Sequence, residues 1–304
     1  MSTTGSPFAV IPDRHLGALL RLALPLALAP FAACTDDTDA GPPDVTSGAY
    51  HGFVQTGWRL PHNATEALAI GADVDGDGTV DNQAGSLIGS LAGLGLALDD
   101  ASREAFAAGD MVALHRLRTD SLAADASIEW RTYEGVPGAA PRYDGTDRFD
   151  VLAATGELRG MIRDGHAELD WGRTTLSLPF FPGQSALWLP LANARMTVDV
   201  TPATCSGRVA GTIATTELEG MILPDLAAEM IIHVARHPDH PFTAIAMQVF
   251  DTNDDGQLTV DEILATPVMR GLFRPDVDTD ADGVKDAMSF GVGFDCVAAT
   301  FTAP

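Results

Sequence analysis

The sequence predicts an α+β fold in which an antiparallel, β-rich middle is flanked by short helices and acidic loops. Apolar and polar residues alternate through much of the middle, for example from Met196 to Val200, which is the period of a half-buried strand. Apolar residues recur at helical spacing from Ala227 to Val234. With 304 residues and a hydrophobic content of 46 %, the chain can bury a substantial core.

The individual elements are predicted from these apolar periods and from the capping residues and prolines that bound them. Short helices are expected over residues 82–92 and from Asp99 or Asp100 to Ala108. Alternation then predicts strands at Val112–Leu117, Ile128 with Trp130, Ala167 with Leu169 and Trp171, Leu176 with Leu178, and Met196–Val200. Pro224 begins a further helix. Two helices, Thr243–Phe250 and Glu262–Phe273, flank an acidic loop, and the second is kinked or broken near Pro267; Phe290–Phe301 is a closing strand.

Residues 251–262 place an oxygen donor at every ligand position of a twelve-residue cation loop. Gly256 stands where such a loop turns with a positive φ, and Leu258 points into the core. The spacing resembles the EF-hand family throughout. The resemblance implies Ca²⁺ held by side chains, one backbone carbonyl, a water-mediated contact and a bidentate carboxylate, supplied in chain order by Asp251, Asn253, Asp255, Gln257, Thr259 and Glu262. An acidic surface turn is the alternative.

Two other loops repeat the first part of this pattern. Each carries carboxylates at positions one, three, five and nine: Asp73, Asp75, Asp77 and Asp81 in the first, and Asp278, Asp280, Asp282 and Asp286 in the second. Position twelve is Ala84 or Ser289, so both lack the bidentate carboxylate. They resemble the DxDxDGxxD loops of dockerins and thrombospondin type 3 repeats. Because four neighbouring carboxylates repel one another, Ca²⁺ is expected in both, with water or a distant residue completing the shell. A solvated acidic turn is the alternative.

The charge of the chain limits its partners. Arginine and lysine together number 18 against 42 acidic residues, for a net charge of −24, and Lys285 is the only lysine. Such a chain should repel nucleic acid and anionic lipid and attract cations. Calcium is therefore the expected cofactor and partner, and no nucleic-acid partner is expected.

The first 49 residues read as an export and anchoring segment. Residues 1–33 combine Arg14 and Arg21 with an apolar run that is too short to span a bilayer, as in a signal peptide. The run ends in Phe31-Ala32-Ala33-Cys34, which resembles the lipobox of bacterial lipoproteins. The resemblance implies lipidation of Cys34 and, because Thr35 follows, an outer-membrane lipoprotein facing the periplasm or cell surface. Ordinary cleavage with a free Cys34 is the alternative. Residues 34–49 are an acidic, flexible tether.

Cysteine usage fits an exported protein. If Cys34 is lipidated, Cys205 and Cys296 remain as an even pair, and a disulfide between them is expected in an oxidising compartment. Two buried free thiols are the alternative. Such a bond would tie an EF-hand region, residues 223–304, to an α/β region, residues 50–222, as one body.

The order of the elements resembles exported lipoproteins of myxobacteria and their relatives, which carry no assigned activity. The features shared are an acidic loop followed by Asn-Gln, a β-rich middle, a late EF-hand, then Asp-Gly-Val-Lys-Asp-Ala and Gly-Val-Gly-Phe. The resemblance implies an exported, calcium-binding protein. The three acidic loops spread along the chain favour a lipid-anchored protein whose fold calcium stabilises, with a non-catalytic structural or surface-binding role. The alternative function is a periplasmic or surface hydrolase.

Two further patterns bear on that alternative. His233, His237 and His240 are spaced to share one helix face and could hold a transition metal, although capping or surface histidines are the preferred interpretation. The apolar segment Leu178–Leu189 could line a ligand groove, and core aromatic residues around a turn are the preferred interpretation.

Overall fold

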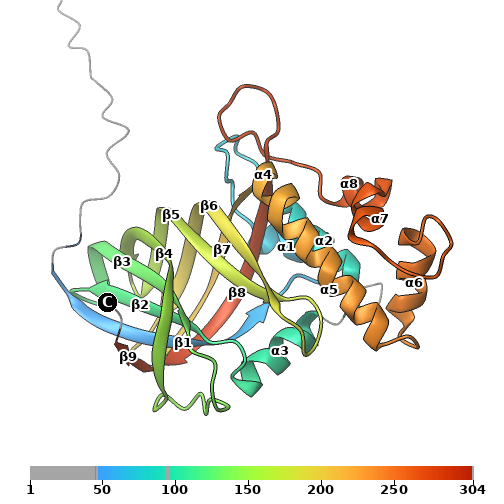
Figure 1. Ribbon diagram of the computed structural model, residues 1–304. Helices are drawn as coiled ribbons and strands as arrows, with labels where there is room; N and C mark the ends of the chain where they lie inside the picture. Colours follow the sequence, from blue (N-terminus) through green and yellow to red (C-terminus); the bar gives the residue numbers. More distant parts are fainter. Residues whose placement is uncertain (1–44, 46, 93–95, 97, 303–304) are drawn as a thin grey trace, which may run out of the picture. The chain divides into compact units, whose positions relative to one another are not determined.

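Eight antiparallel strands close on themselves to form a barrel, as the computed structural model shows (Figure 1). The structure describes residues 45, 47–92, 96 and 98–302. The strands are β1 (Ala49–Arg59), β2 (Ala113–Thr119), β3 (Ala124–Gly135), β4 (Arg148–Arg163), β5 (His166–Pro179), β6 (Ala186–Val200), β7 (Thr204–Ala214) and β8 (Ala287–Ala298). A short strand, β9 (Thr300–Thr302), lies parallel to the start of β4. The fold is thus α+β, as predicted from the sequence.

Each strand pairs with the next along the chain, and β8 returns to pair with β1. In this closing pair Phe53 lies opposite Ala298. The sequence pattern suits an open antiparallel sheet with one face covered. The sheet is instead closed, because β1 pairs with both β2 and β8, which leaves no free edge there.

The helices are inserted at two places in this meander. Between β1 and β2 lie α1 (Ala64–Ile70), α2 (Gln83–Ala92) and α3 (Leu98–Ala108). Between β7 and β8 lie α4 (Thr215–Glu217), the π-helical turn η1 (Leu218–Ile222), α5 (Leu223–Arg236), α6 (Pro241–Phe250), α7 (Val260–Ala265) and α8 (Pro267–Leu272). The exit helix breaks at Thr266, as expected: Pro267 cannot donate a backbone hydrogen bond, and the Thr266 side chain caps the next helix instead.

The main core is continuous from the barrel interior to the helices. On β3 the even-numbered side chains, beginning with Ile128 and Trp130, point into the barrel, because successive residues of a strand face opposite sides. The Trp130 ring stacks on Phe53 of β1, with ring centroids 6.2 Å apart. Towards the helices, Phe290 of β8 joins Ile222 and Leu226 in the same apolar cluster. The helices therefore cover one end of the inner core.

A disulfide joins Cys205 of β7 to Cys296 of β8, which confirms the predicted pair. The two residues lie directly opposite each other in the register of these strands, with Cα atoms 4.9 Å apart. A disulfide is typical of oxidising, extracytoplasmic compartments.

The predictions for the N-terminal segment concern residues that the structure does not describe. The signal peptide, the lipidation of Cys34 and nearly all of the tether lie outside the described residues. Among the helices that the structure does describe, none is both long and apolar enough to cross a membrane.

Candidate metal loops and a barrel cavity

The three acidic loops fold in the same way, although they lie far apart in the sequence. Each turns at a glycine with positive φ: 87° at Gly78, 79° at Gly256 and 90° at Gly283. A side chain would strain the backbone there, which explains why the sixth position is glycine. The amide of that glycine donates to the aspartate at position one in every loop, over 2.7 to 3.1 Å. The sequence pattern thus specifies one local backbone shape three times.

Loop 251–262 joins α6 to α7, as an EF-hand loop does. The amide of Asp255 donates to the side chains of Asp251 and Asn253, so these three residues curl around one space. At the far end, Glu262 and Thr259 form a capping box that begins α7. Oε2 of Glu262 accepts hydrogen bonds from Thr259, whereas Oε1 is buried and has no hydrogen-bond partner among the described residues. A buried carboxylate oxygen without a donor fits a cation ligand.

Of the other features expected in this loop, the burial of Leu258 is confirmed, whereas two ligand roles stay predictions. Leu258 is buried in the main core, as predicted. The backbone amide of Gln257 donates to the Asp255 side chain. The role of the Gln257 backbone carbonyl as a calcium ligand stays a prediction. The water-mediated role of Thr259 also stays a prediction, because its hydroxyl is engaged in the capping box.

The other two loops each bring three carboxylates together. Oxygen atoms of Asp73, Asp75 and Asp81 lie within 4.8 Å of one another, and so do those of Asp278, Asp280 and Asp282. Such triads could hold a metal ion. The two other expected ligands are not members of these triads: Asp77 accepts from the Thr79 amide, and Asp286 accepts from the amide and hydroxyl of Thr279.

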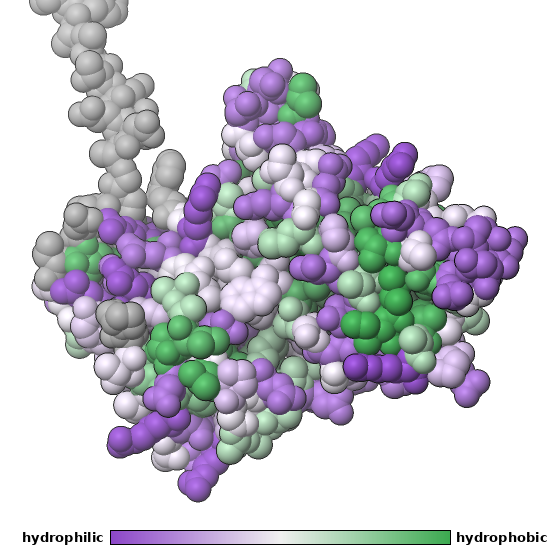
Figure 2. All heavy atoms as spheres, viewed as in Figure 1, coloured by the Kyte–Doolittle hydropathy of each residue, from purple (hydrophilic) through white to green (hydrophobic). Residues whose placement is uncertain are grey.

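Loops 73–81 and 278–286 lie side by side, and we call them the paired loops. Val74 and Val277 are buried against each other together with Ala287, although about two hundred residues separate the two valines. In Figure 1 the two loops project together beyond the helices, and Figure 2 shows mainly hydrophilic residues on this projection. The sequence does not indicate this pairing, because nothing local in the chain reports a contact between segments so far apart.

The pairing concentrates negative charge. Burial, together with the neighbouring carboxylates of Asp75, Asp276 and Asp77, raises the pKa of the Asp81 carboxyl to about 6. Asp276 precedes the second loop, so its effect on Asp81 comes from across the pair. Lys285 donates to the backbone carbonyl of Asp276. A carboxylate that is both desolvated and surrounded by like charges favours a bound cation.

The rings of the three histidines lie close together, but their nitrogen atoms do not form a group of metal ligands. His233 is buried, stacks on Phe181 with ring centroids 4.5 Å apart, and lies 4.8 and 5.1 Å from the rings of His237 and His240. His240 caps α6, and burial lowers the pKa of His233 to about 4. Within the described chain, three candidate ligand atoms lie within 4.8 Å of one another only in the two aspartate triads. The histidines therefore form no metal site as they stand.

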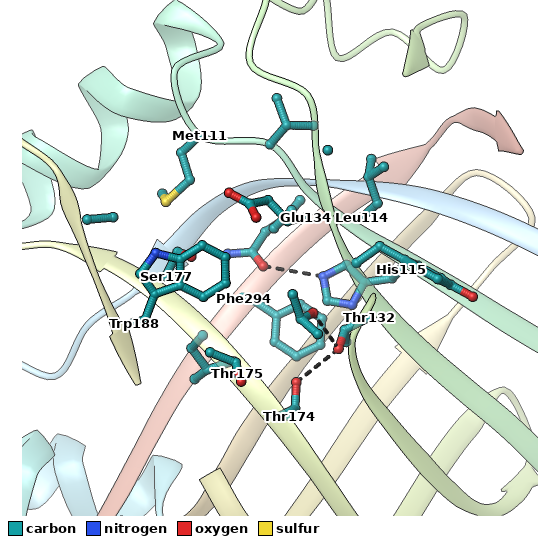
Figure 3. A pocket seen from close by; sticks show the side chains of 18 of the residues that line it. Met111, Leu114, His115, Thr132, Glu134, Thr174, Thr175, Ser177, Trp188 and Phe294 are labelled. Carbon is teal, nitrogen blue, oxygen red and sulfur yellow. Dashed lines mark hydrogen bonds between the residues drawn. The ribbon is translucent and has the colours of Figure 1, made fainter. Parts of the chain in front are cut away.

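A cavity of about 210 Å³ opens inside the barrel (Figure 3). Its mouth lies where β4 and β5 separate, because their pairing ends at Gly156 and Thr174. The aromatic side chains of Trp58, Trp188 and Phe294 form part of its wall. An eight-stranded barrel has an interior wide enough for side chains or for one small ligand.

The polar groups deep in this cavity bond to one another. Trp130 donates its indole N–H to Nδ1 of His115 over 3.1 Å, and Nε2 of His115 lies 3.3 Å from the Gln55 amide oxygen. Because Nδ1 accepts, Nε2 carries the proton and donates to Gln55. Burial lowers the pKa of His115 to about 4, so the imidazole is neutral at physiological pH. Above it, Thr132 shares hydroxyl bonds of 2.9 Å with both Thr155 and Thr174.

This cavity was not predicted from the sequence, although one signal for it is present there. Ile128 and Trp130 were recognised as a strand. Continuing the alternation adds Thr132 and then Glu134 to the same inward row, which places a carboxylate at the mouth of the barrel. The segment Leu178–Leu189 contributes to both expected environments: Phe181 and Leu187 are buried in the core, and Trp188 lines the cavity.

Together these features define an α+β protein with a closed antiparallel barrel, a disulfide and acidic loops that could hold metal ions. Comparison with known protein families, with curated proteins and with solved structures found no match to this chain. The likenesses to EF-hands, to dockerin and thrombospondin type 3 loops and to myxobacterial lipoproteins therefore stay predictions.

Proposed function

We propose that this is an exported, lipid-anchored binding or structural protein whose fold calcium stabilises. The observation that carries the proposal is the pair of loops 73–81 and 278–286, in which Asp81 is desolvated among three other carboxylates. Without a cation, this arrangement opposes folding, because like charges are held together away from water. A divalent ion bound in each triad offsets that repulsion.

The donor set favours calcium among the divalent ions. Every candidate ligand in the three loops is an oxygen atom, which suits hard cations. Calcium accepts six to eight oxygen atoms in irregular geometry, whereas magnesium demands near-ideal octahedral geometry. The unpartnered Oε1 of Glu262 supports bidentate binding in the loop 251–262. Asp251, Asn253, Asp255 and Glu262 would hold the ion there.

The place of the paired loops in the fold suggests what calcium does for the protein. Loop 73–81 leads directly into α2, and loop 278–286 leads directly into β8, the strand that closes the barrel against β1. Calcium bound in both loops would fix the start of α2 against the start of β8. It would thereby stabilise the closed barrel instead of signalling through a moving helix pair.

Calcium binding to the folded chain alone stabilises it by about 2.7 kcal/mol per site at a hundred times the dissociation constant. We therefore expect chelation to lower the melting temperature and calcium to restore it. The measurement is calorimetric melting of the whole exported protein after chelation, followed by titration with Ca²⁺ and, separately, Mg²⁺. Residual metal is assayed in each sample.

A pair of variants distinguishes calcium binding in the paired loops from a general effect of net charge on stability. Asp278→Asn with Asp280→Asn removes two carboxylates from one triad, and Asp150→Asn with Asp164→Asn removes two exposed carboxylates from elsewhere. The first variant should lose part of the calcium-dependent rise in melting temperature, and the second should retain it. An identical melting curve with and without calcium, in protein shown to be metal-free at the start, would refute the proposal.

A further inference from the structure

The Glu134 carboxylate lines the barrel cavity and has no partner among the described residues. Deep in the cavity, His115, Gln55 and Thr132 are engaged in hydrogen bonds with neighbouring side chains. At the mouth, no described residue donates a hydrogen bond to the Glu134 carboxylate or forms an ion pair with it. Burial raises the pKa of this carboxyl above its usual value, and no cationic neighbour counteracts the effect.

Glu134 reaches the cavity because of its place on β3. It lies opposite Ala113 of β2 and Ala153 of β4, two small residues that leave space beside its side chain. It belongs to the inward-facing row that begins with Ile128 and Trp130. Figure 3 shows Glu134, Met111 and Trp188 around the same space, with His115 and Phe294 deeper in the barrel.

The lining of the cavity carries negative charge only. Among its lining residues in the described part of the chain, the side chains with a formal charge are Asp110 and Glu134, and none is an arginine or lysine. Asp110 is exposed at the mouth, whereas Glu134 is partly buried. An anionic ligand would be repelled here. A neutral apolar ligand would leave the Glu134 carboxylate both desolvated and unpaired.

The remaining walls suit a flat apolar body. Trp58 lines the cavity and is held in place by a hydrogen bond from its indole N–H to the Ser177 carbonyl, over 3.0 Å. Trp188 also lines the cavity and is exposed to solvent. Aromatic rings bind apolar groups and also attract cations to their faces. A cavity of about 150 Å³ holds benzene, so 210 Å³ accommodates a ring with a short side chain.

We propose that the barrel cavity binds a small organic cation, a protonated amine carried on an apolar or aromatic body. The ammonium group would pair with the Glu134 carboxylate at the mouth. The apolar body would lie between Trp58, Trp188 and Phe294. This inference goes beyond the role of calcium and does not depend on it, because no cavity residue belongs to the acidic loops.

Three probes of matched size test the proposal: 2-phenylethylamine as the cation, 2-phenylethanol as the neutral analogue and 3-phenylpropanoate as the anion. Their affinities for the full protein are measured by calorimetry in saturating calcium, which keeps the acidic loops filled. The amine should bind about tenfold more tightly than the alcohol, as expected for a desolvated charge pair with aromatic contacts, and the anion should bind most weakly. The indole N–H signals of Trp58 and Trp188 should shift in NMR spectra when the amine is added.

Two substitutions locate the effect. Glu134→Gln keeps the size of the side chain and removes its charge, so the preference for amine over alcohol should disappear. Glu168→Gln removes an exposed charge from the outer surface of β5 and should leave the preference unchanged. The proposal is overturned if no probe binds, if the amine and the alcohol bind equally well, or if the preference persists in Glu134→Gln.

Discussion

Asn82 and Gly291 are joined by two hydrogen bonds, although 209 residues separate them. The Asn82 amide nitrogen donates to the Gly291 carbonyl over 2.9 Å, and its oxygen accepts from the Gly291 amide over 2.8 Å. Asn82 directly follows loop 73–81, and Gly291 lies on β8 just beyond loop 278–286. The same side chain also bonds to Ala67 and Gly85. One buried asparagine therefore fastens α1, α2 and β8 together beneath the paired loops.

Replacing Asn82 by alanine should destabilise the protein strongly. The change leaves the buried amide and carbonyl of Gly291 without their Asn82 partners, and each such group costs about 1 to 3 kcal/mol. The Ala67 carbonyl loses one donor and still accepts from the Gly71 amide. We expect a loss of at least about 3 kcal/mol in the free energy of unfolding, measured by urea denaturation in saturating calcium. The neighbouring Gln83→Ala serves as the control and should cost little, because no hydrogen bond of the Gln83 side chain is present among the described contacts. Equal effects of the two substitutions would contradict the assigned role.

Glu262→Gln should weaken calcium binding at loop 251–262 and leave the paired loops able to bind. The amide oxygen of glutamine can still accept from Thr259 and preserve the capping box, whereas the charge and the second carboxylate oxygen are lost. We expect affinity at one site to fall by about tenfold or more in a calorimetric titration. Asp261→Asn, which alters the adjacent exposed residue, is the matched control. If both variants titrate like the original protein, loop 251–262 holds no calcium.

The buried imidazole of His115 should make the fold sensitive to acid. Its pKa is about 4 in the folded protein and about 6.5 in an unfolded chain, so the unfolded state takes up a proton first as the pH falls. Stability from this group is complete above pH 6.5 and is lost progressively towards pH 4, by up to about 3 kcal/mol. In NMR spectra at pH 5.5, His115 should remain neutral with its proton on Nε2.

A substitution isolates this contribution from that of other groups. In His115→Phe the free energy of unfolding should fall less steeply between pH 7 and pH 5.5, even though the variant is less stable at pH 7 because Trp130 and Gln55 lose their partner. A protonated His115 at pH 5.5, or an unchanged slope in the variant, would show that burial does not suppress its charge.

Loss of the Cys205–Cys296 disulfide should lower the free energy of unfolding by about 2 to 4 kcal/mol, because the bond closes a long loop in the unfolded chain. The measurement compares the oxidised protein with a Cys205→Ser, Cys296→Ser variant in urea. Alkylation of the denatured, unreduced protein followed by mass spectrometry provides the control. Labelling of both cysteines in that sample would mean that the bond is absent from the protein.

Local sequence was sufficient for the features that local chemistry determines. The glycine and carboxylate spacing predicted three loops of one shape, and the structure gives all three the same turn at Gly78, Gly256 and Gly283. Alternation predicted strands such as the one around Ile128 and Trp130. The pairing of the two cysteines followed from their number and the expected compartment.

The features that depend on distant pairing could not be predicted in this way. Segment 49–59 mixes polar residues such as His51, Gln55 and Thr56 with two glycines, so no regular alternation marks the strand that closes the barrel. The contact between Val74 and Val277 exists only because β8 returns to β1, which no local period records. The cavity was missed for the same reason: Glu134 faces it from one strand, whereas the aromatic wall comes from three others.

The pairing of Phe53 with Ala298 also constrains the order in which the chain can fold. Strands β2 to β7 form a meander of neighbours and can assemble early, since each joins its partner through a short connection. The seam between β1 and β8 cannot form before residues close to 298 are available to pair with β1. Such a high contact order makes the final step slow, in the range of milliseconds to seconds typical of all-β topologies, and leaves two unpaired strand edges exposed until it is complete.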